Sequence, residues 1–239
     1  MMIRTLKYSF LAVVTLVLSI SASYAGSWQK EFGIDKCHLM TTGQNKYFVL
    51  EPGYQLVYEG EDTKMQITVL DEVKTVAGIN ARVVEEREWK NGELHEVARN
   101  FFAICEQTKD VYYFGEEVDY YDKGKVVNHA GSWEAGKGDN KPGLMMPAQP
   151  VVGMKFYQEI APTIAMDRAK VVSVSETCKM PAGTFTECLK VEESNAVTFW
   201  SSFKTEYKMH APGIGLVQDE DLVLVKYGKI NVATSEPTE

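Results

Sequence analysis

Residues 81–105 of the chain read ARVVEEREWKNGELHEVARNFFAIC, and this stretch decides the fold. Two β-rich runs, Ala81–Trp89 and Glu93–Cys105, flank the dipeptide Asn91-Gly92. Asn-Gly between two such runs is the strongest short signal for a β-hairpin with a two-residue turn. The stretch therefore predicts an antiparallel hairpin.

The register of this hairpin follows from the position of the turn. Opposite charges and apolar groups that face each other across two strands stabilise a sheet. A turn at Asn91-Gly92 brings such groups together, which supports the register. The predicted cross-strand pairs are Lys90–Glu93, Trp89–Leu94, Glu88–His95 and Arg87–Glu96.

Strand signals continue on both sides of the hairpin. Short runs rich in β-branched and aromatic residues alternate with turn residues, and no stretch after residue 25 has the sustained periodicity of a helix. Pro162–Arg168 is long enough for one or two helical turns only. The other predicted strands are Tyr54–Glu59, Lys64–Leu70, Val111–Val118, Val126–Ala130, Met154–Glu159, Lys170–Cys178, Phe185–Glu192, Ser202–His210 and Gly215–Tyr227.

These strands predict an all-β fold, a single antiparallel meander of about ten strands. A twisted sheet of that size curls, so we expect a strongly curved half-barrel or barrel. Glu134–Pro150 is rich in Gly and Pro and lacks periodicity, and we expect it to form one long ordered loop. The β domain is expected to span residues 26–230, followed by a disordered polar tail at 231–239.

The first 25 residues have the pattern of a cleavable signal peptide. Arg4 and Lys7 precede an apolar run, Phe10–Ile20, that is too short to span a bilayer as a stable helix. Ser23-Tyr24-Ala25 supplies small residues before a cleavage site after Ala25. We therefore expect a soluble periplasmic or secreted protein with no transmembrane segment in its mature chain.

The composition narrows the classes of partner. Loss of Arg4 and Lys7 takes the formal net charge from −8 to −10. An acidic surface disfavours nucleic acids and anionic lipid headgroups as partners, because both are anions. No nucleic-acid binding is expected.

Four cysteines, an even number in an exported chain, indicate disulfides. Cys178 and Cys188 flank the turn 179–184, and a hairpin centred on Gly183 would place them opposite each other at disulfide distance. Cys37–Cys105 follows as the second bridge by elimination. The alternative is that Cys178 and Cys188 are buried free thiols.

The sequence contains no complete motif for catalysis or for cofactor binding. Gly131–Gly138 resembles a Walker A loop. However, Gly138 stands at the position where the motif has the Ser or Thr that binds magnesium, and the flanking segments are predicted strands rather than a helix. There is no Gly-x-Ser-x-Gly elbow and no His-Glu-x-x-His helix. No catalytic residue and no cofactor are assigned.

Soft metal ligands cluster at Cys37–Met40, Met145-Met146 and Met209-His210. Methionines in apolar runs are usually core filler, and a disulfide would remove the Cys37 thiolate. Asp219–Asp221 lacks calcium-loop spacing and is interpreted as a solvated turn. No metal site is expected.

Aromatic and apolar residues gather around the Gly/Pro-rich segment. A curved sheet covered by such a segment can enclose a concave apolar pocket, although core packing explains the same residues. We expect the 134–150 loop to act as a lid over this pocket. The candidate ligand-binding residues are Tyr113, Trp133, Met145, Met146 and Phe156.

Five blocks in one order give the chain a further resemblance. They are Asn45–Gly53, Val111–Glu116, Gly131–Gly136, Pro142–Ala148 and Ala211–Val217, which include YFGE, GSWEAG, PGLMMPA and APGIGLV. This series resembles a group of exported bacterial β-rich proteins. The resemblance implies no activity and no catalytic residue, and it implies an architecture similar to the curved sheets of periplasmic lipoprotein carriers.

The sequence favours a protein that binds an apolar or amphipathic small molecule or lipid on a concave sheet face. The alternatives are a hydrolase with a dispersed active site and an envelope protein–protein interaction module. A carboxylate or histidine with a strongly shifted pKa in a cleft would favour the enzyme. A dry aromatic groove would favour the binder, and a flat exposed apolar patch the interaction module.

Overall fold

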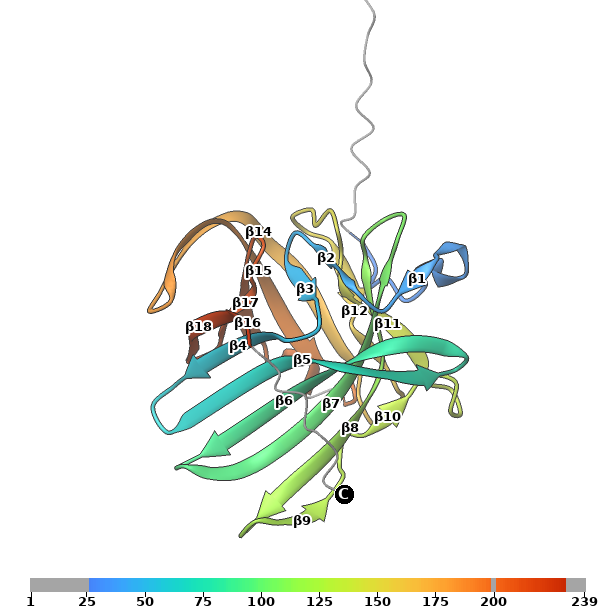
Figure 1. Ribbon diagram of the computed structural model, residues 1–239. Coiled ribbons are helices and arrows are strands. Elements are labelled where there is room, and N and C mark those ends of the chain that lie inside the picture. Colours follow the sequence, from blue (N-terminus) through green and yellow to red (C-terminus); the bar gives the residue numbers. More distant parts are fainter. Residues whose placement is uncertain (1–25, 199–200, 231–239) are drawn as a thin grey trace, which may run out of the picture.

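A computed structural model describes residues 26–198 and 201–230 of the chain (Figure 1). The predicted signal peptide, residues 1–25, and the predicted tail, residues 231–239, lie outside the described residues. Within the described part the regular structure consists of β-strands and two short 3-10 turns, η1 (Ile34–Lys36) and η2 (Ser201–Phe203). The expectation of an all-β fold is confirmed.

The strands follow one another along the chain with short connections. The first eight are β1 (Leu39–Met40), β2 (Gly43–Asn45), β3 (Phe48–Leu50), β4 (Tyr54–Glu59), β5 (Thr63–Val76), β6 (Ile79–Lys90), β7 (Glu93–Cys105) and β8 (Val111–Asp122). The next five are β9 (Lys125–Asn128), β10 (Trp133–Glu134), β11 (Lys141–Met146), β12 (Lys155–Tyr157) and β13 (Glu159–Ile160). The last five are β14 (Asp167–Met180), β15 (Gly183–Asn195), β16 (Glu206–Ala211), β17 (Gly215–Asp219) and β18 (Leu222–Lys229).

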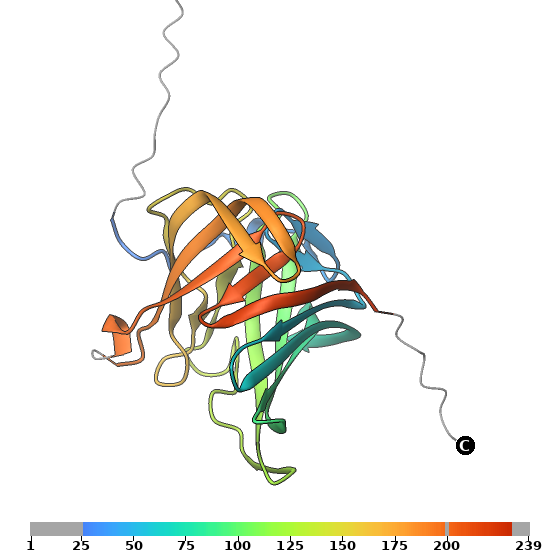
Figure 2. The same ribbon diagram turned by 90° about the vertical axis from the view of Figure 1, so that its left-hand side faces the viewer.

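One antiparallel sheet joins nearly all of these strands and curls into a nearly closed barrel (Figures 1 and 2). Its order is β12-β14-β15-β16-β17-β18-β4-β5-β6-β7-β8-β11-β13. The two ends of this order, β12 and β13, are neighbours in the chain, so residues 155–160 bring the sheet back to its start. The backbone N–H of Gln158 also donates to the carbonyl oxygen of Asp167, 2.7 Å away, across this seam.

The hairpin at Asn91-Gly92 forms as predicted, with Lys90 opposite Glu93 and Trp89 opposite Leu94. Beyond these pairs a β-bulge between Glu88 and Trp89 shifts the register by one residue. Glu88 therefore faces Glu96 and Arg87 faces Val97, so the predicted pairs with His95 and Glu96 are wrong. The bulge was invisible in the charge pattern because the shifted pairing gains burial rather than charge complementarity.

The expected single long loop at 134–150 is wrong in part, because Glu134 and Lys141–Met146 form strand along the barrel, while residues 135–140 and 147–150 remain loop. After β9, the chain returns beside β8 as β10 and then β11, and β11 pairs with β13 on its other edge. Gly143 permits this close approach, since a Cβ atom there would clash with the backbone of Gln158. The segment closes the barrel wall and is not a lid.

The N-terminal segment is held against β7 by a disulfide bond. Cys37 and Cys105 are bridged with Cα atoms 5.2 Å apart, and β1 pairs with the end of β7 beside them. The predicted Cys37–Cys105 bridge is therefore confirmed. It joins residues 68 positions apart in the sequence.

The predicted Cys178–Cys188 bridge is wrong in this structure, where both residues are buried free cysteines. The hairpin of β14 and β15 turns at Pro181-Ala182 rather than at Gly183, so Cys178 pairs with Phe185. A bulge near Glu187, whose φ is 56°, then places Cys188 opposite Glu176. The turn was misplaced because Gly183 was taken as its centre, whereas the glycine begins the second strand.

Two clusters of buried residues stabilise the barrel. The larger contains Phe101, Phe114 and Phe156 and extends from the N-terminal segment to β15. The smaller lies between β4, β18 and the β14–β15 hairpin, around Tyr58 and Leu224. In residues 26–198 and 201–230, no helix has the length and apolar character needed to cross a membrane.

Candidate functional site

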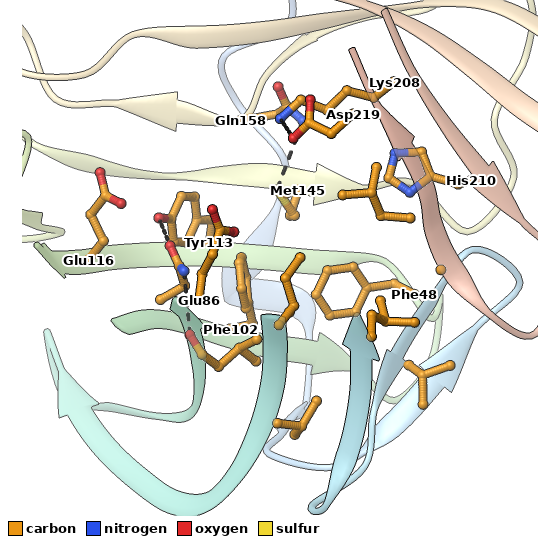
Figure 3. Close-up of a pocket in the computed structure, with 18 of the residues that line it drawn as sticks. Phe48, Glu86, Phe102, Tyr113, Glu116, Met145, Gln158, Lys208, His210 and Asp219 are labelled. Atoms are coloured by element: carbon orange, nitrogen blue, oxygen red, sulfur yellow. Dashed lines mark hydrogen bonds and ion pairs between the residues drawn. The ribbon is translucent and has the colours of Figure 1, made fainter. Parts of the chain in front are cut away.

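A cavity of about 270 Å³ lies inside the barrel (Figure 3). This volume is just below the ~300–1,000 Å³ of typical small-molecule sites. Its lining comes from nearly every long strand, and the character of the lining differs between two sides. We call these sides the apolar wall and the acidic wall.

The apolar wall comes from β3, β4 and β5. Phe48 packs edge-on against Phe102 of β7, with ring centroids 5.2 Å apart, and Leu56 pairs with Ile67 across two strands. Leu216 and Ile214 extend this wall. The residues of the apolar wall on these three strands are Phe48, Val49, Tyr54, Leu56, Ile67 and Val69.

The acidic wall collects one carboxyl group from each of six strands, β6, β8, β13, β14, β15 and β17. These groups are Glu86, Glu116, Glu159, Asp167, Glu193 and Asp219. Lys208 of β16 is the one Lys or Arg among the described residues that line the cavity. The lining therefore contains more acidic side chains than basic ones.

Lys208 neutralises only one part of the acidic wall. Its Nζ lies 3.2 Å from a carboxylate oxygen of Glu193 and 3.2 Å from one of Asp219. Gln158 Nε2 donates to the other oxygen of Glu193 at 2.7 Å. Figure 3 shows Lys208, Asp219 and Gln158 together at one side of the cavity, with Glu116 and Glu86 further along the wall.

Burial and mutual repulsion shift the carboxyl groups toward their protonated forms. Burial raises the pKa of Glu86 to about 8, of Glu116 to about 7 and of Asp167 to about 6. The pKa of Glu159 is also raised, by burial first and then by the carboxylates of Glu116 and Asp167. Although burial alone would lower it, the pKa of Lys208 is raised by Glu193 and Asp219.

Three buried polar atoms of the lining have no hydrogen-bond partner among the described residues. They are Gln158 Oε1, Glu159 Oε2 and His210 Nδ1, on side chains that are 5%, 9% and 5% exposed. Burial lowers the pKa of His210 to about 3, so its imidazole is neutral. Buried polar groups are nearly always paired with protein or with ordered water, so these three atoms are the positions of the lining at which a water or a bound molecule would make a hydrogen bond.

The acidic wall follows from strand periodicity. Successive side chains of a strand alternate between faces, so residues two apart share one face. Val84 and Glu86 on β6, and Val191 and Glu193 on β15, are such pairs in which a buried apolar residue precedes a carboxyl group on the inner face. The carboxyl groups therefore point inward by the same alternation that buries the core.

A second cavity of about 870 Å³ adjoins the first, and Glu116 lines both. Its lining includes Trp133, whose indole Nε1 is buried without a partner among the described residues. The Trp133 ring packs edge-on against Tyr113, with centroids 5.4 Å apart. The two cavities thus meet at Glu116, beside Tyr113.

The five predicted ligand-binding residues separate into three groups. Tyr113 and Met145 line the barrel cavity, and the Tyr113 hydroxyl donates to Asn100 there. Trp133 lines the second cavity. Met146 and Phe156, at 2% and 1% exposed, are core residues that line neither cavity. Core packing, the alternative interpretation, therefore accounts for those two.

The sequence interpretation missed the acidic wall altogether. Asp219 was assigned to a solvated turn, and it lines the cavity instead. The available signal was the alternation of Val84, Glu86 and Glu88, which places acids in phase with buried residues. Among the described residues, no group of three or more His, Cys, Asp or Glu side chains is placed to hold a metal ion.

Comparisons with known proteins give no match: no protein-family model, no curated protein and no solved structure matches this chain. The proposals that follow rest on the residues, contacts and charges of the two cavities.

Proposed function

We propose that this protein binds an amphipathic small molecule or lipid inside its barrel. The observation that carries the proposal is the division of one cavity into an apolar wall and an acidic wall with unpaired buried acceptors. The predicted signal peptide supports a site of action outside the cytoplasm, in the periplasm or after secretion. The binding site is the barrel interior rather than an open sheet face.

The apolar wall would bury the hydrocarbon part of the ligand. Transfer of apolar surface out of water contributes about 25 cal/mol per Å². Leu56 and Ile67 are partners across the paired strands β4 and β5, and Phe48, from the separate two-stranded sheet of β2 and β3, lines the same cavity. Preformed walls of this kind require little ordering when the ligand enters.

The acidic wall would hold the polar part of the ligand. Gln158 Oε1 and Glu159 Oε2 are without partners although each side chain is more than nine-tenths buried. A buried polar group that lacks a hydrogen bond costs about 1–3 kcal/mol, which a bound donor would remove. We therefore expect the cavity to bind most tightly a ligand that has both an apolar body and a polar end.

General acid–base catalysis, as in a hydrolase with a dispersed site, is the second candidate function. It is favoured by Glu116, whose pKa is raised to about 7 by burial, close to the carboxyl group of Glu159 that shifts with it. Turnover of an ester or glycoside panel that Glu116→Gln abolishes would support this enzyme. Catalysis requires bound substrate, so the binding test comes first.

The test of binding uses N-phenyl-1-naphthylamine, a neutral apolar fluorophore. Its fluorescence should rise saturably with the wild-type protein. Ile67→Trp fills the apolar wall and should weaken binding at least tenfold, and the smaller change Leu216→Phe should weaken it less. The control is Val127→Trp, an exposed residue of β9 that is 57% accessible. Unchanged binding by folded Ile67→Trp and Leu216→Phe proteins would contradict the proposal.

A further inference from the structure

We propose that the polar end of the ligand is a protonated amine, held in the barrel by Glu159, Gln158 and Glu116. The inference rests on the proposed binding function and adds the chemical class of the head group. It follows from the charge of the lining, from the kind of atoms left without partners and from the position of the apolar wall.

The charge of the lining calls for a cation. Six carboxyl groups line the cavity against the single ammonium of Lys208, which already contacts Glu193 and Asp219. Glu86, Glu116, Glu159 and Asp167 are left around the remaining space. An added positive charge near them favours their ionised forms, whereas an added negative charge would repel them.

Two of the three unpaired atoms of the lining, Gln158 Oε1 and Glu159 Oε2, are oxygens that match the donors of an ammonium group, whereas His210 Nδ1 donates or accepts according to its tautomer. Gln158 Oε1 is an amide oxygen and accepts only, and the amide nitrogen of the same side chain donates to Glu193. Glu159 Oε2 accepts when its carboxyl group is ionised. A primary ammonium has three N–H donors and a full positive charge, whereas a hydroxyl has one donor and no charge. Glu116, which lines both cavities, supplies a further acceptor.

The apolar wall favours an organic cation over a bare metal ion. Phe48, Leu56 and Ile67 line the same cavity as the carboxyl groups, and Ile67 lies directly beside Glu86, its partner across β5 and β6. A metal ion and its waters would leave this surface wet, while an alkyl or aryl amine covers it. The ligand class is therefore a primary amine with an apolar body of modest size.

Binding of the amine should release protons. Burial holds the carboxyl groups partly protonated near neutral pH, and a bound ammonium would lower their pKa values again. The groups that face this cation come from every part of the wall. The charged and titratable groups of the wall are Glu86, Glu116, Glu159, Asp167, Glu193, Asp219, Lys208 and His210. Glu96 of β7 lies outside the lining, and its charge acts on Glu86 and Glu116.

The experiment is calorimetric titration of the full mature protein with three probes that share one chain: n-octylamine, n-octanol and n-octanoate, at pH 7. The amine is a cation at this pH because alkylamines have pKa values near that of lysine, about 10.4. We expect octylammonium to bind at least tenfold more tightly than octanol, and octanoate to bind most weakly. The titration is repeated in phosphate and in Tris, because the released proton is taken up by the buffer. The apparent binding enthalpies in the two buffers should differ by an amount that corresponds to roughly one proton transferred to the buffer.

Two variants distinguish a direct contact between Glu159 and the ammonium group from an effect of the protein's overall negative charge. Glu159→Gln should remove most of the preference for octylammonium and leave octanol binding unchanged. Glu117→Gln makes the same change on the exposed face of β8, next to Glu116, and should leave the preference intact. If Glu159→Gln does not fold, Glu116→Gln serves as the second variant with the same expectation.

The outcomes distinguish this inference from the proposed function. Equal or tighter binding of octanol or octanoate, or a preference that survives both Glu159→Gln and Glu116→Gln, would overturn the amine assignment. Binding inside the barrel would stand in those cases, provided that Ile67→Trp weakens it. Octyl probes that all bind independently of Ile67→Trp would overturn both.

Discussion

The apolar wall and the acidic wall share one cavity, but they contribute oppositely to folding. Phe48, Phe102 and Leu56 remove apolar surface from water and stabilise the barrel. The carboxyl groups of Glu86 and Glu159 lose their hydration on folding, and burial raises their pKa values. The difference indicates that the apolar wall stabilises the fold, whereas the buried carboxyl groups of Glu86 and Glu159 do not, which agrees with our proposal that they hold a ligand.

The largest effect should come from Phe102 of β7, which lines the cavity and packs against Phe48 of the apolar wall. Phe102 is 4% exposed and stacks on Tyr113 with centroids 4.6 Å apart. Phe102→Ala should lower the free energy of unfolding by about 3–5 kcal/mol, as for other buried Phe truncations. Urea unfolding at pH 5 and at pH 8 should give the same loss, because no titrating group is removed. A loss of stability seen at only one of the two pH values would contradict the claim that Phe102 stabilises the barrel through apolar burial alone.

A smaller loss should follow from removing the cation of the acidic wall. Lys208→Met leaves Glu193 and Asp219 without their partner, and breaking a buried pair this way costs about 3–5 kcal/mol. The Lys208 side chain is 25% exposed, which screens the charges, so we expect about 2–4 kcal/mol.

The matched control for Lys208→Met is the triple variant with Glu193→Gln and Asp219→Asn. It removes the stranded charges together with the cation, so most of the lost stability should return. A triple variant as unstable as Lys208→Met would show that Lys208 acts through packing rather than through charge.

The smallest effect should be a gain in stability. A carboxyl group with a raised pKa contributes stability that is fully present below its unfolded pKa and is lost as the pH rises through its folded pKa. For Glu86 that window runs from about 4.5 to about 8. At about 1.4 kcal/mol per pKa unit this window would correspond to about 5 kcal/mol. Because the Glu86 side chain is only partly buried and solvent screens its charge, we expect a smaller effect: Glu86→Gln should match the wild type at pH 5 and be more stable by about 1–2 kcal/mol at pH 8. Thermal melts at both pH values provide the measurement, and equal stability at pH 8 would contradict the burial of this charge.

The sequence predicted the fold wherever the signal lies within a few neighbouring residues, as it does in a tight turn or in the alternation of buried and exposed residues along a strand. Asn91-Gly92 fixed the central hairpin, and the strand periodicity predicted the all-β class. The strand β11 was missed because Pro142 and Gly143 resemble loop residues. Gly143 is required there by the backbone of Gln158, which lies 15 residues further along the chain, beyond the span of a turn or a single strand, and so leaves no local signal.

The candidate site was less predictable than the fold. Tyr113 and Met145 were identified because aromatic and sulfur side chains near a glycine-rich segment suggest a pocket. Glu86 and Glu193 were not, because acids in strands usually face solvent. Their inward direction depends on which face of each strand the closed barrel encloses, and bulges such as the one at Glu88 reset that face.

The most direct measurement compares two adjacent methionines. Met145 lines the cavity and Met146 is 2% exposed in the core. In the NMR spectrum of protein labelled with ¹³C at the methionine methyl groups, assigned with Met145→Leu and Met146→Leu, addition of N-phenyl-1-naphthylamine should shift the Met145 signal strongly through ring currents and leave Met146 nearly unchanged. Saturable binding of the probe with no shift at Met145 would contradict the claim that the barrel interior is the binding site.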